Sequence, residues 1–461
     1  SYGYSNKNIS LKWKHIFSNK MNALFTGGID NYSYDISSDR NPVNAYELRF
    51  GIDQYYFKAH FNYYLDSKHT IDYGINFINY RLNPGTYSPD GEKSLVMADA
   101  VNKEQALESA IYLNDKYDIT SGLTLEAGIR YSVFNVIGPQ DVNVYEPGMP
   151  KTEENRIETI SYEKGKFIKT YGGPEYRVSL RQMIGLNGSI KAGFNTQRQY
   201  IHMLSNTTAI APTDIWKLSD PNIRPQRGSQ VSLGYYQNLK SNSIETSVEV
   251  YYKKIRDYLD YKSGATLVMN HSIETDVINT KGRAYGVEVM IKKPAGKLNG
   301  WISYTYSRIL LRQDDPNAGE VINEGNEYPA NYDKPNDVTL IGNYKINHRF
   351  SISLNATYST GRPITLPIGR YYYAGSYRTL YDQRNAHRIP DYFRADFSLN
   401  IDGNHKVKQK THNSWTLGVY NLTGRKNPFS VYYVSEGGAI NGYKLSIFGS
   451  AIPFISYNIR F

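Results

Sequence analysis

The chain ends with Ala-Ile-Pro-Phe-Ile-Ser-Tyr-Asn-Ile-Arg-Phe, residues 451–461, in which apolar and polar side chains alternate. The apolar positions on one side are Ile455, Tyr457, Ile459 and Phe461, and the polar positions on the other are Ser456, Asn458 and Arg460. A period of two is the pattern of a β-strand with one face in an apolar environment and the other in water. A chain that stops on such a strand is typical of a β-barrel that closes on itself.

The same alternation recurs along nearly the whole chain. Between 392 and 401 the uncharged face carries Phe393, Ala395, Phe397, Leu399 and Ile401, and the other face carries Arg394 and Asp396. A charge that faced lipid at mid-membrane would cost about 2–4 kcal/mol, and the apolar face avoids this cost. The pattern therefore predicts an all-β protein, a transmembrane antiparallel β-barrel with about 17 strands in this chain. The alternative is a large soluble β-sandwich or solenoid.

Composition fits a barrel better than a helical membrane protein. The mean hydropathy of -0.56 is too low for transmembrane helices, whereas a barrel strand needs only every second residue apolar. Tyrosine accounts for 44 of 461 residues, and amphipathic rings are typical of the two membrane–water boundaries. Cysteine is absent, which excludes disulfides and thiol chemistry. The net charge of +10 is spread along the chain, so no nucleic-acid partner is expected.

Turn lengths divide into two kinds that alternate along the chain. Short turns are expected near 18–20, 66–68, 120–122, 184–185, 240–242, 294–297, 347–349 and 403–413. Long loops are expected over 84–104, 139–165, 204–226, 258–276, 312–333, 360–388 and 435–442. Short periplasmic turns and long extracellular loops are the known asymmetry of outer-membrane barrels, which places Phe461 at the periplasmic rim. The last two strands are predicted over 415–434 and 443–461.

Several stretches resemble one family of outer-membrane proteins, the TonB-dependent receptors of the type common in Bacteroidota. They are Asp214–Gln226 with Ser232–Tyr235, Gly282–Val289, Trp301–Ser307, Arg388–Asp396 and Val419–Pro428, followed by the aromatic terminal strand. Each stretch is a weak pattern alone, but their order over more than half of the chain makes the resemblance strong. The positions Ile455, Tyr457, Ile459 and Phe461 resemble the signal by which such barrels are recognised for assembly.

The resemblance implies a 22-stranded barrel around an N-terminal plug in a Gram-negative outer membrane. The predicted number of strands is odd, and the first strand runs toward the short turns. Both features fit a chain that lacks the plug and about five strands of the family's barrel. Residues 1–461 are therefore expected to be barrel alone. Residues 1–8 are polar and show no signal peptide, so either it was cleaved off or the chain begins downstream of the true start.

The implied function is import of a scarce solute, either an oligosaccharide, a metal chelate, cobalamin or a peptide, into the periplasm. The implied partners are outer-membrane lipid, the TonB–ExbB–ExbD complex acting through the missing N-terminal part, and the barrel assembly machinery. A surface lipoprotein covers the loops in some relatives, although the length of this barrel argues slightly against one. The alternatives are a passive porin-like or adhesin-like barrel without energy coupling and a soluble carbohydrate-binding protein.

Catalytic and metal-binding motifs are absent from the sequence. It holds no G-x-S-x-G elbow, phosphate-binding glycine loop or H-E-x-x-H pair, so neither an enzyme nor a cofactor is expected. His405 and His412 share one predicted turn, but a metal site needs three or four ligands. The acidic residues of the loop after 310 are Asp314, Asp315, Glu320, Glu324 and Glu327. Their spacing fits no known calcium loop, and a solvated loop is the favoured interpretation.

Aromatic and cationic side chains gather in the loop over 360–388. Stacking and bidentate hydrogen bonding by such residues grip sugars, aromatic chelates or peptides. The predicted ligand-binding residues are Arg370, Tyr371, Tyr372, Tyr373, Tyr377 and Arg378, with Tyr200, Trp216 and Tyr328 as further candidates; packing among the loops is the alternative role. The charges predicted to face the lumen or the plug are Glu126, Arg130, Glu245, Glu249, Arg394 and Asp396. Half-buried charges need partners, either one another or the plug.

Overall fold

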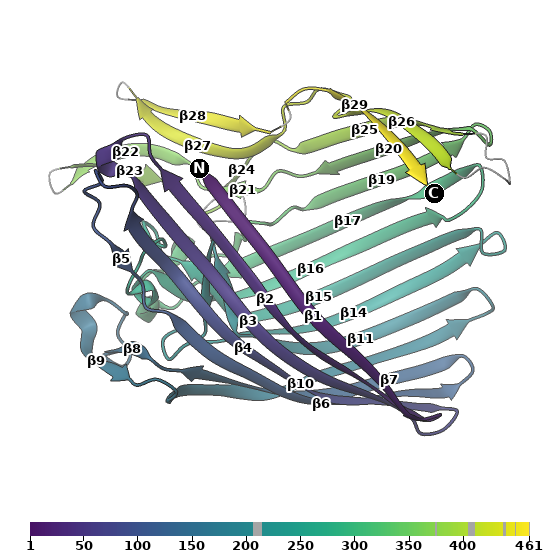
Figure 1. The fold of residues 1–461 in the computed structure, drawn as a ribbon, viewed down its shortest axis with the longest axis horizontal. Coiled ribbons are helices and arrows are strands. Elements are labelled where there is room, and N and C mark those ends of the chain that lie inside the picture. Colours follow the sequence, from purple (N-terminus) through teal and green to yellow (C-terminus); the bar gives the residue numbers. More distant parts are fainter. Residues whose placement is uncertain (206–213, 374–375, 404–410, 437–438, 448, 461) are drawn as a thin grey trace.

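The computed structural model describes residues 1–205, 214–373, 376–403, 411–436, 439–447 and 449–460, and it is an antiparallel β-barrel wall (Figure 1). The main sheet holds 19 strands, of which β5 (Asp99–Ala100) and β18 (Tyr328–Pro329) are two-residue pairings; the other 17 form the wall and confirm the predicted number. The wall strands are β1 (Tyr2–Ser18), β2 (Met21–Ser38), β3 (Tyr46–Tyr64), β4 (His69–Pro89), β6 (Glu104–Thr120), β7 (Leu123–Ile137), β10 (Phe167–Ile184), β11 (Gly188–Gln199), β14 (Gln226–Leu239), β15 (Ile244–Tyr261), β16 (Val277–Lys293), β17 (Leu298–Arg312), β19 (Asn336–Lys345), β20 (Phe350–Ser359), β25 (Tyr392–Asp402), β26 (His412–Tyr420) and β29 (Ile452–Arg460).

Each wall strand pairs with the next wall strand along the chain. Short turns join the strands on one side, here called the turn side, and long loops join them on the other, the loop side. Within the described part of the chain, β1 pairs only with β2 and β29 only with β26, so the sheet is open between these two strands. Phe461 lies outside the described residues, while Ile455, Tyr457 and Ile459 lie on β29 with exposed side chains.

The two faces of the wall differ as the alternation predicts. Exposed apolar side chains line the outer face, for example Val231, Leu233 and Tyr235 on β14. A membrane crossing needs about 10 residues in a barrel strand. Most wall strands are longer than this, so many continue beyond the lipid on the loop side. Among the described residues no helix is both long and apolar enough to cross a membrane.

The predicted lumen charges all lie on the inner face and have neighbours in the wall. Arg130 donates to Glu108 at 3.0 Å, and Asn114 donates to Glu126 at 3.3 Å. The remaining contacts are Lys292 to Glu245 at 3.0 Å, Arg394 to Asp396 at 2.7 Å, and the Tyr236 hydroxyl to Glu249. The wall itself therefore supplies partners for these charges, and contact with a plug stays a prediction.

The last two predicted strands are each interrupted, which corrects the prediction of continuous strands over 415–434 and 443–461. β26 ends at Tyr420 because Asn421 and Gly424 adopt the left-handed backbone, with φ of 51° and 62°. Buried Asn421 donates its side-chain amide to the Arg425 and Ser450 carbonyls, which fixes the break. The chain then forms a separate hairpin of β27 (Pro428–Glu436) and β28 (Ala439–Ser446) before β29 begins.

The long loops carry secondary structure of their own. Their hairpins pair β8 (Gln140–Tyr145) with β9 (Arg156–Tyr162), β12 (Ile201–Leu204) with β13 (Ile215–Leu218), β21 (Pro363–Ile364) with β24 (His387–Arg388), and β22 (Pro367–Tyr373) with β23 (Ser376–Tyr381). Short 3₁₀ turns are η1 (Pro42–Asn44), η2 (Glu153–Asn155), η3 (Ile273–Thr275), η4 (Pro316–Ala318) and η5 (Ile322–Gly325). These segments hold much of the buried apolar core, so the core sits at the loop side.

Candidate ligand-binding site

The β12–β13 hairpin folds into the lumen rather than away from it. Leu218 of this hairpin and Tyr200, just before it, join an apolar cluster with inner-face residues of β2, β3, β4, β6 and β7. Tyr200 stacks on Phe134 with ring centroids 4.7 Å apart, and its hydroxyl bonds Ser132 at 2.8 Å. Trp216 packs at the edge of the same cluster. The aromatic residues near this loop thus hold the hairpin against the wall.

A buried ion triad fixes the hairpin to β6. The Lys217 ammonium donates to Glu104 at 2.8 Å and to Asp220 at 2.6 Å, and the Leu218 amide donates to the other Glu104 oxygen at 2.9 Å. Burial alone would lower the pKa of Lys217, but the two carboxylates outweigh it and raise that pKa. The ammonium is therefore charged at neutral pH, and in this structure it is paired with both carboxylates.

His202 of β12 is expected to make the hairpin sensitive to acid. The ring bonds Ser219 at 2.9 Å and is buried, and burial, followed by the charge of Lys217, lowers the pKa of His202 to about 4. A histidine whose pKa is lowered by folding contributes its full stability above pH 6.5, which is the ordinary pKa of a histidine side chain. This contribution is lost as the pH falls toward 4. Between pH 6.5 and pH 4 we expect the free energy of opening of the hairpin to fall by about 3 kcal/mol.

Hydrogen exchange of the β12 and β13 amides at pH 7.5 and pH 4 measures this loss. We expect exchange to accelerate at pH 4 in the wild type and to become much less pH-dependent in His202→Gln. The matched control, His348→Gln, changes an exposed turn histidine and should leave the pH dependence intact. Equal acceleration in wild type and His202→Gln would show that another group responds to the acid.

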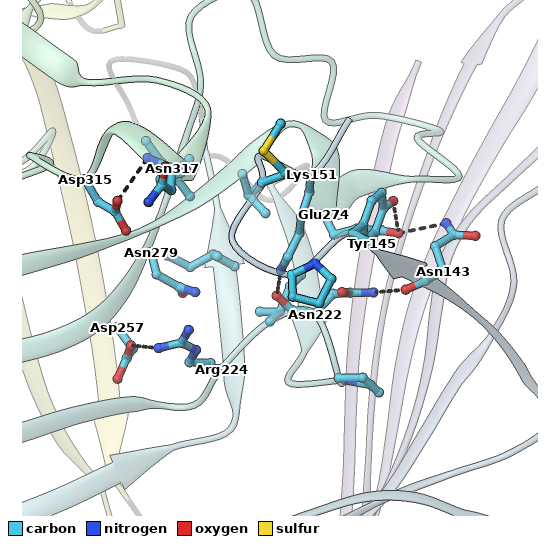
Figure 2. A pocket seen from close by; sticks show the side chains of 18 of the residues that line it. Asn143, Tyr145, Lys151, Asn222, Arg224, Asp257, Glu274, Asn279, Asp315 and Asn317 are labelled. Carbon is cyan, nitrogen blue, oxygen red and sulfur yellow. Dashed lines mark hydrogen bonds and ion pairs between the residues drawn. The ribbon is translucent and has the colours of Figure 1, made fainter. Parts of the chain in front are cut away.

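A cavity of about 1210 Å³ lies at the loop side, next to this hairpin (Figure 2). Its walls come from the β8–β9 hairpin, the segment that leads into β14, the loop-side ends of β15 and β16, and the loop after β17. The basic lining residues are Lys151, Lys169, Arg224, Arg227, Arg256, Lys262 and Lys281, and the acidic ones are Glu146, Asp257, Glu274, Asp314 and Asp315. Basic groups outnumber acidic groups, so the cavity favours an anionic occupant.

Hydrogen bonds between distant segments shape this cavity. Glu274 accepts from Asn143 at 2.8 Å and from the Tyr145 hydroxyl at 3.0 Å, which ties the β8–β9 hairpin to the loop after β15 (Figure 2). Asn222 donates to the Asn143 carbonyl at 2.9 Å and accepts from the Lys151 ammonium through its own carbonyl. These hydrogen bonds join the segments that form the walls of the cavity. They therefore keep the cavity open and fix the positions of its charged side chains.

Three cations, Lys151, Lys262 and Arg224, lie at the cavity, each with carboxylates nearby. Burial lowers the pKa of Lys151 and of Lys262, although nearby carboxylates oppose the effect in both cases. Arg224 lies 3.7 Å from Asp257, the residue that also binds Arg227 at 2.7 Å. Asp257 reaches them from a β-bulge in β15, where its backbone is left-handed with φ of 55°. One carboxylate therefore serves two guanidinium groups.

Two amide side chains that line the cavity are left unsatisfied. The Asn279 Oδ1 and the Gln313 Nε2 are buried and have no hydrogen-bond partner among the described residues. An unpaired buried polar atom costs about 1–3 kcal/mol. An acceptor and a donor that face the same cavity are therefore ready to bond a ligand that carries both hydroxyl and oxyanion groups.

The structure places the predicted ligand-binding residues outside this cavity. Arg370, Tyr371 and Tyr372 lie on β22, and Arg378 lies on β23; the rings of Tyr371 and Tyr372 are 48% and 65% exposed. The side chains of Tyr373 and Tyr377 lie outside the described set. A ligand role for this hairpin stays a prediction.

The other two candidates have structural contacts. Trp216 borders a second cavity of about 70 Å³ that adjoins the first. Tyr328 is buried, and its hydroxyl donates to Asp260 at 2.6 Å beside the Arg384 guanidinium. Burial raises the pKa of Tyr328 and the charge of Asp260 raises it further, so the phenol stays neutral. Tyr328 thus serves the packing of the loops in this structure.

The acidic loop is engaged in ion pairs. Asp314 contacts Lys281 at 3.3 Å and Arg312 at 3.1 Å, and Glu327 contacts Arg283 at 2.6 Å. Across the ranges that the structure describes, no group of three or more metal-ligating side chains converges. His405 lies outside those ranges.

Comparison with known proteins gives one family and many structural relatives. A family model described as "TonB dependent receptor-like, beta-barrel" matches residues 1–422. No match was found among curated proteins. One similar solved structure is the ferric-catecholate import receptor Fiu from E. coli K12 in its closed form, with a TM-score of 0.61 and 13% sequence identity. Another is BauA, the ferric preacinetobactin receptor from Acinetobacter baumannii, with a TM-score of 0.61 and 12% identity. A third is the siderophore receptor PiuA from Acinetobacter baumannii, with a TM-score of 0.63 and 13% identity.

The matches cover nearly all of this chain but only part of each relative. They extend over 99%, 99% and 100% of this chain, and over 64%, 63% and 65% of Fiu, BauA and PiuA. At this identity the likeness concerns the fold. The chain thus spans slightly under two thirds of these relatives.

Proposed function

Because the chain belongs to the TonB-dependent receptor-like β-barrel family, we propose that it forms the barrel of an importer that captures a scarce solute at the cell surface and releases it into the periplasm. The family consists of transport receptors of the Gram-negative outer membrane and not of enzymes. The observation that carries the proposal is the loop-side cavity with its surplus of cations and its unpaired Asn279 and Gln313 amides.

The cavity chemistry favours one class of solute. Lys151, Lys262 and Arg224 suit oxyanions, and Asn279 Oδ1 needs a hydroxyl or amide donor. An anionic metal chelate with hydroxyl and carboxylate groups, or an acidic oligosaccharide, offers both. These groups support such solutes over a neutral or largely apolar one.

The inward hairpin supports gated import over passive diffusion. A porin needs a continuous aqueous lumen, whereas β12 and β13 lie inside the barrel and are locked by the buried triad of Lys217. Passage would then require an energised displacement. We assign that work to the TonB–ExbB–ExbD complex acting through an N-terminal plug, and assembly of the barrel to the assembly machinery that reads the terminal strand. The Bacteroidota subtype is part of this proposal and rests on the motif resemblance alone, and a surface lipoprotein is not part of it.

Lys151→Met is expected to weaken binding of an anionic solute about tenfold or more, because a hydrogen bond to a charged group contributes about 1.5–3 kcal/mol. Isothermal titration of the full-length protein with ferric citrate and with oligogalacturonate measures the affinity, and maltoheptaose is the neutral comparison. Since burial lowers the pKa of Lys151, the affinity should also fall as the pH rises through that lowered value, before ordinary lysines deprotonate.

The matched control is Lys164→Met, which changes an exposed lysine that does not line the cavity. Its affinity should equal that of the wild type. Tight binding of maltoheptaose, or equal affinities in Lys151→Met and wild type, would contradict the assignment of the cavity. Uptake of the bound probe by cells, with and without an uncoupler, then distinguishes energised import from diffusion.

A further inference from the structure

A tight turn over residues 220–223, here called the Asp220 turn, forms part of the cavity wall. The Ile223 amide donates to the Asp220 carbonyl at 3.2 Å, and Pro221 presets the backbone of the second turn position. The Asp220 Oδ1 accepts the Asn222 amide at 2.7 Å and the Ile223 amide at 2.8 Å. Pro221, Asn222 and Ile223 line the cavity. One buried carboxylate therefore fixes the shape of this part of the wall.

The other oxygen of the same carboxylate belongs to the buried triad that holds the β12–β13 hairpin. The Asp220 Oδ2 accepts the Lys217 ammonium at 2.6 Å, and Lys217 also donates to Glu104 of β6 at 2.8 Å. Because both oxygens belong to one carboxyl group, the Asp220 turn and the triad cannot shift independently. A displacement of the turn in the cavity wall is therefore transmitted to the contact that docks the hairpin.

The triad itself is short of positive charge. Lys217 brings one positive charge, whereas Glu104 and Asp220 each bring a negative one. Both Glu104 oxygens accept hydrogen bonds, from Lys217 and from the Leu218 amide, which favours the ionised form. Burial nevertheless raises the pKa of Glu104. A buried surplus of negative charge is costly, so the triad is stabilised by any further cation close to it.

Lys151 supplies that cation from the cavity side. Its ammonium donates to the Asn222 carbonyl, inside the Asp220 turn (Figure 2). Burial lowers the pKa of Lys151, and the charge of Asp220, followed by that of Glu274, opposes this effect. Lys151 therefore has two roles in the solute-free protein: it holds the turn by a hydrogen bond, and it balances the surplus charge of the triad.

We propose that the Asp220 turn couples loading of the cavity to release of the β12–β13 hairpin. A solute oxyanion that pairs with Lys151 offsets the positive charge that stabilises Asp220 and competes with the Asn222 carbonyl for the ammonium. The triad then holds the hairpin less tightly, so the loaded protein opens more readily than the empty one. The inference rests on the proposed function of the cavity and adds a link from bound solute to the hairpin that obstructs the lumen.

The first test needs no solute. Hydrogen exchange of the β12 and β13 amides is measured at pH 7.5 in the full-length wild type and in Lys151→Met. We expect the variant to exchange about tenfold faster, because a hydrogen bond to a charged group is lost together with the balancing charge. Lys164→Met, which changes an exposed lysine in the turn after β9, should exchange like the wild type. Unchanged exchange at the turn-side ends of the wall strands shows that the barrel is folded.

Glu104→Gln tests whether the surplus charge is the cause. Glutamine keeps an acceptor for the Leu218 amide but removes one negative charge, so the triad no longer needs Lys151 as a balance. In this background the acceleration caused by Lys151→Met should be at least about twofold smaller, as for residues that interact. An equal acceleration in both backgrounds would show that Lys151 acts on the hairpin independently of the triad, and the proposed coupling would be wrong.

The second test adds a saturating concentration of ferric citrate, with maltoheptaose as the neutral comparison. Ferric citrate should accelerate exchange of the β12 and β13 amides about tenfold in the wild type and cause no further acceleration in Lys151→Met. If ferric citrate binds by titration but leaves this exchange unchanged or slows it, the coupling is overturned while the cavity assignment stands. If it does not bind, the cavity assignment fails, and the solute-free comparison alone decides whether the Asp220 turn carries the coupling.

Discussion

Lys217→Met is expected to release the β12–β13 hairpin from the barrel wall and open the lumen. The change leaves Glu104 and Asp220 buried without their shared cation, and breaking a buried ion pair from one side costs about 3–5 kcal/mol. Because Lys217 and the Leu218 amide bind the hairpin to Glu104 of β6, the cost falls first on its local opening. Hydrogen exchange of residues 201–204 and 215–218 in the full-length protein should accelerate by about two to three orders of magnitude.

Two further variants identify the cause of this release. Lys297→Met removes an exposed lysine in a short turn and should leave exchange unchanged. Adding Glu104→Gln and Asp220→Asn to Lys217→Met removes the unpaired charges, so exchange should slow again toward the wild-type rate. If the single variant exchanges like the wild type, the hairpin is held by its apolar contacts and the gating argument loses its basis.

Asp333→Asn is expected to loosen the second buried network, which joins the loop after β17 to the segment before β25. The Asp333 side chain is 0% exposed, lies 3.3 Å from Arg308, pairs with Arg388, and accepts the Ile309 amide at 2.7 Å. Asparagine keeps an acceptor for the amide but leaves two guanidinium groups without their anion. We expect the free energy of local unfolding of this loop to fall by about 3 kcal/mol. This is the lower end of the range for breaking a buried ion pair, because both arginines are partly exposed.

Limited proteolysis and hydrogen exchange between residues 309 and 335 measure this second loss. Asp39→Asn, at an exposed position beyond β2, is the matched control. Cleavage that begins in 309–335 in Asp333→Asn alone would support the assigned role. Equal resistance of both variants would mean that the loop is held by its apolar cluster around Tyr328 and Ile322.

The wall could be predicted from the sequence because its determinants are local. Alternation such as Val231, Leu233 and Tyr235 fixes a strand and its faces without knowledge of any partner, and short turns then fix the neighbour. The break at Asn421 was missed because apolar alternation continues on both sides of it. Only the left-handed backbone and the side-chain contacts of Asn421 divide β26 from β27.

The site could not be predicted because its residues gather from distant segments. Lys151, Asn279 and Gln313 carry no motif, and the loops that bring them together are joined by contacts such as Asn143 with Glu274, 131 positions apart. The aromatic run at 371–373 gave a stronger local signal, yet it lies on a separate hairpin. A charged residue inside an apolar segment, as at Lys217 in β13, was the one available hint of a buried partner.

The chain separation within the buried triad also sets an order of assembly. Each wall strand meets its neighbour across one turn or one loop, so each of these closures loses less chain entropy than the contact of Lys217 with Glu104, which are 113 positions apart and belong to different parts of the wall. The hairpin can dock only after β6 and the strands that carry it, β11 and β14, are in place. A newly inserted barrel would therefore pass through a stage in which β12 and β13 are not yet docked in the lumen and are open to proteases.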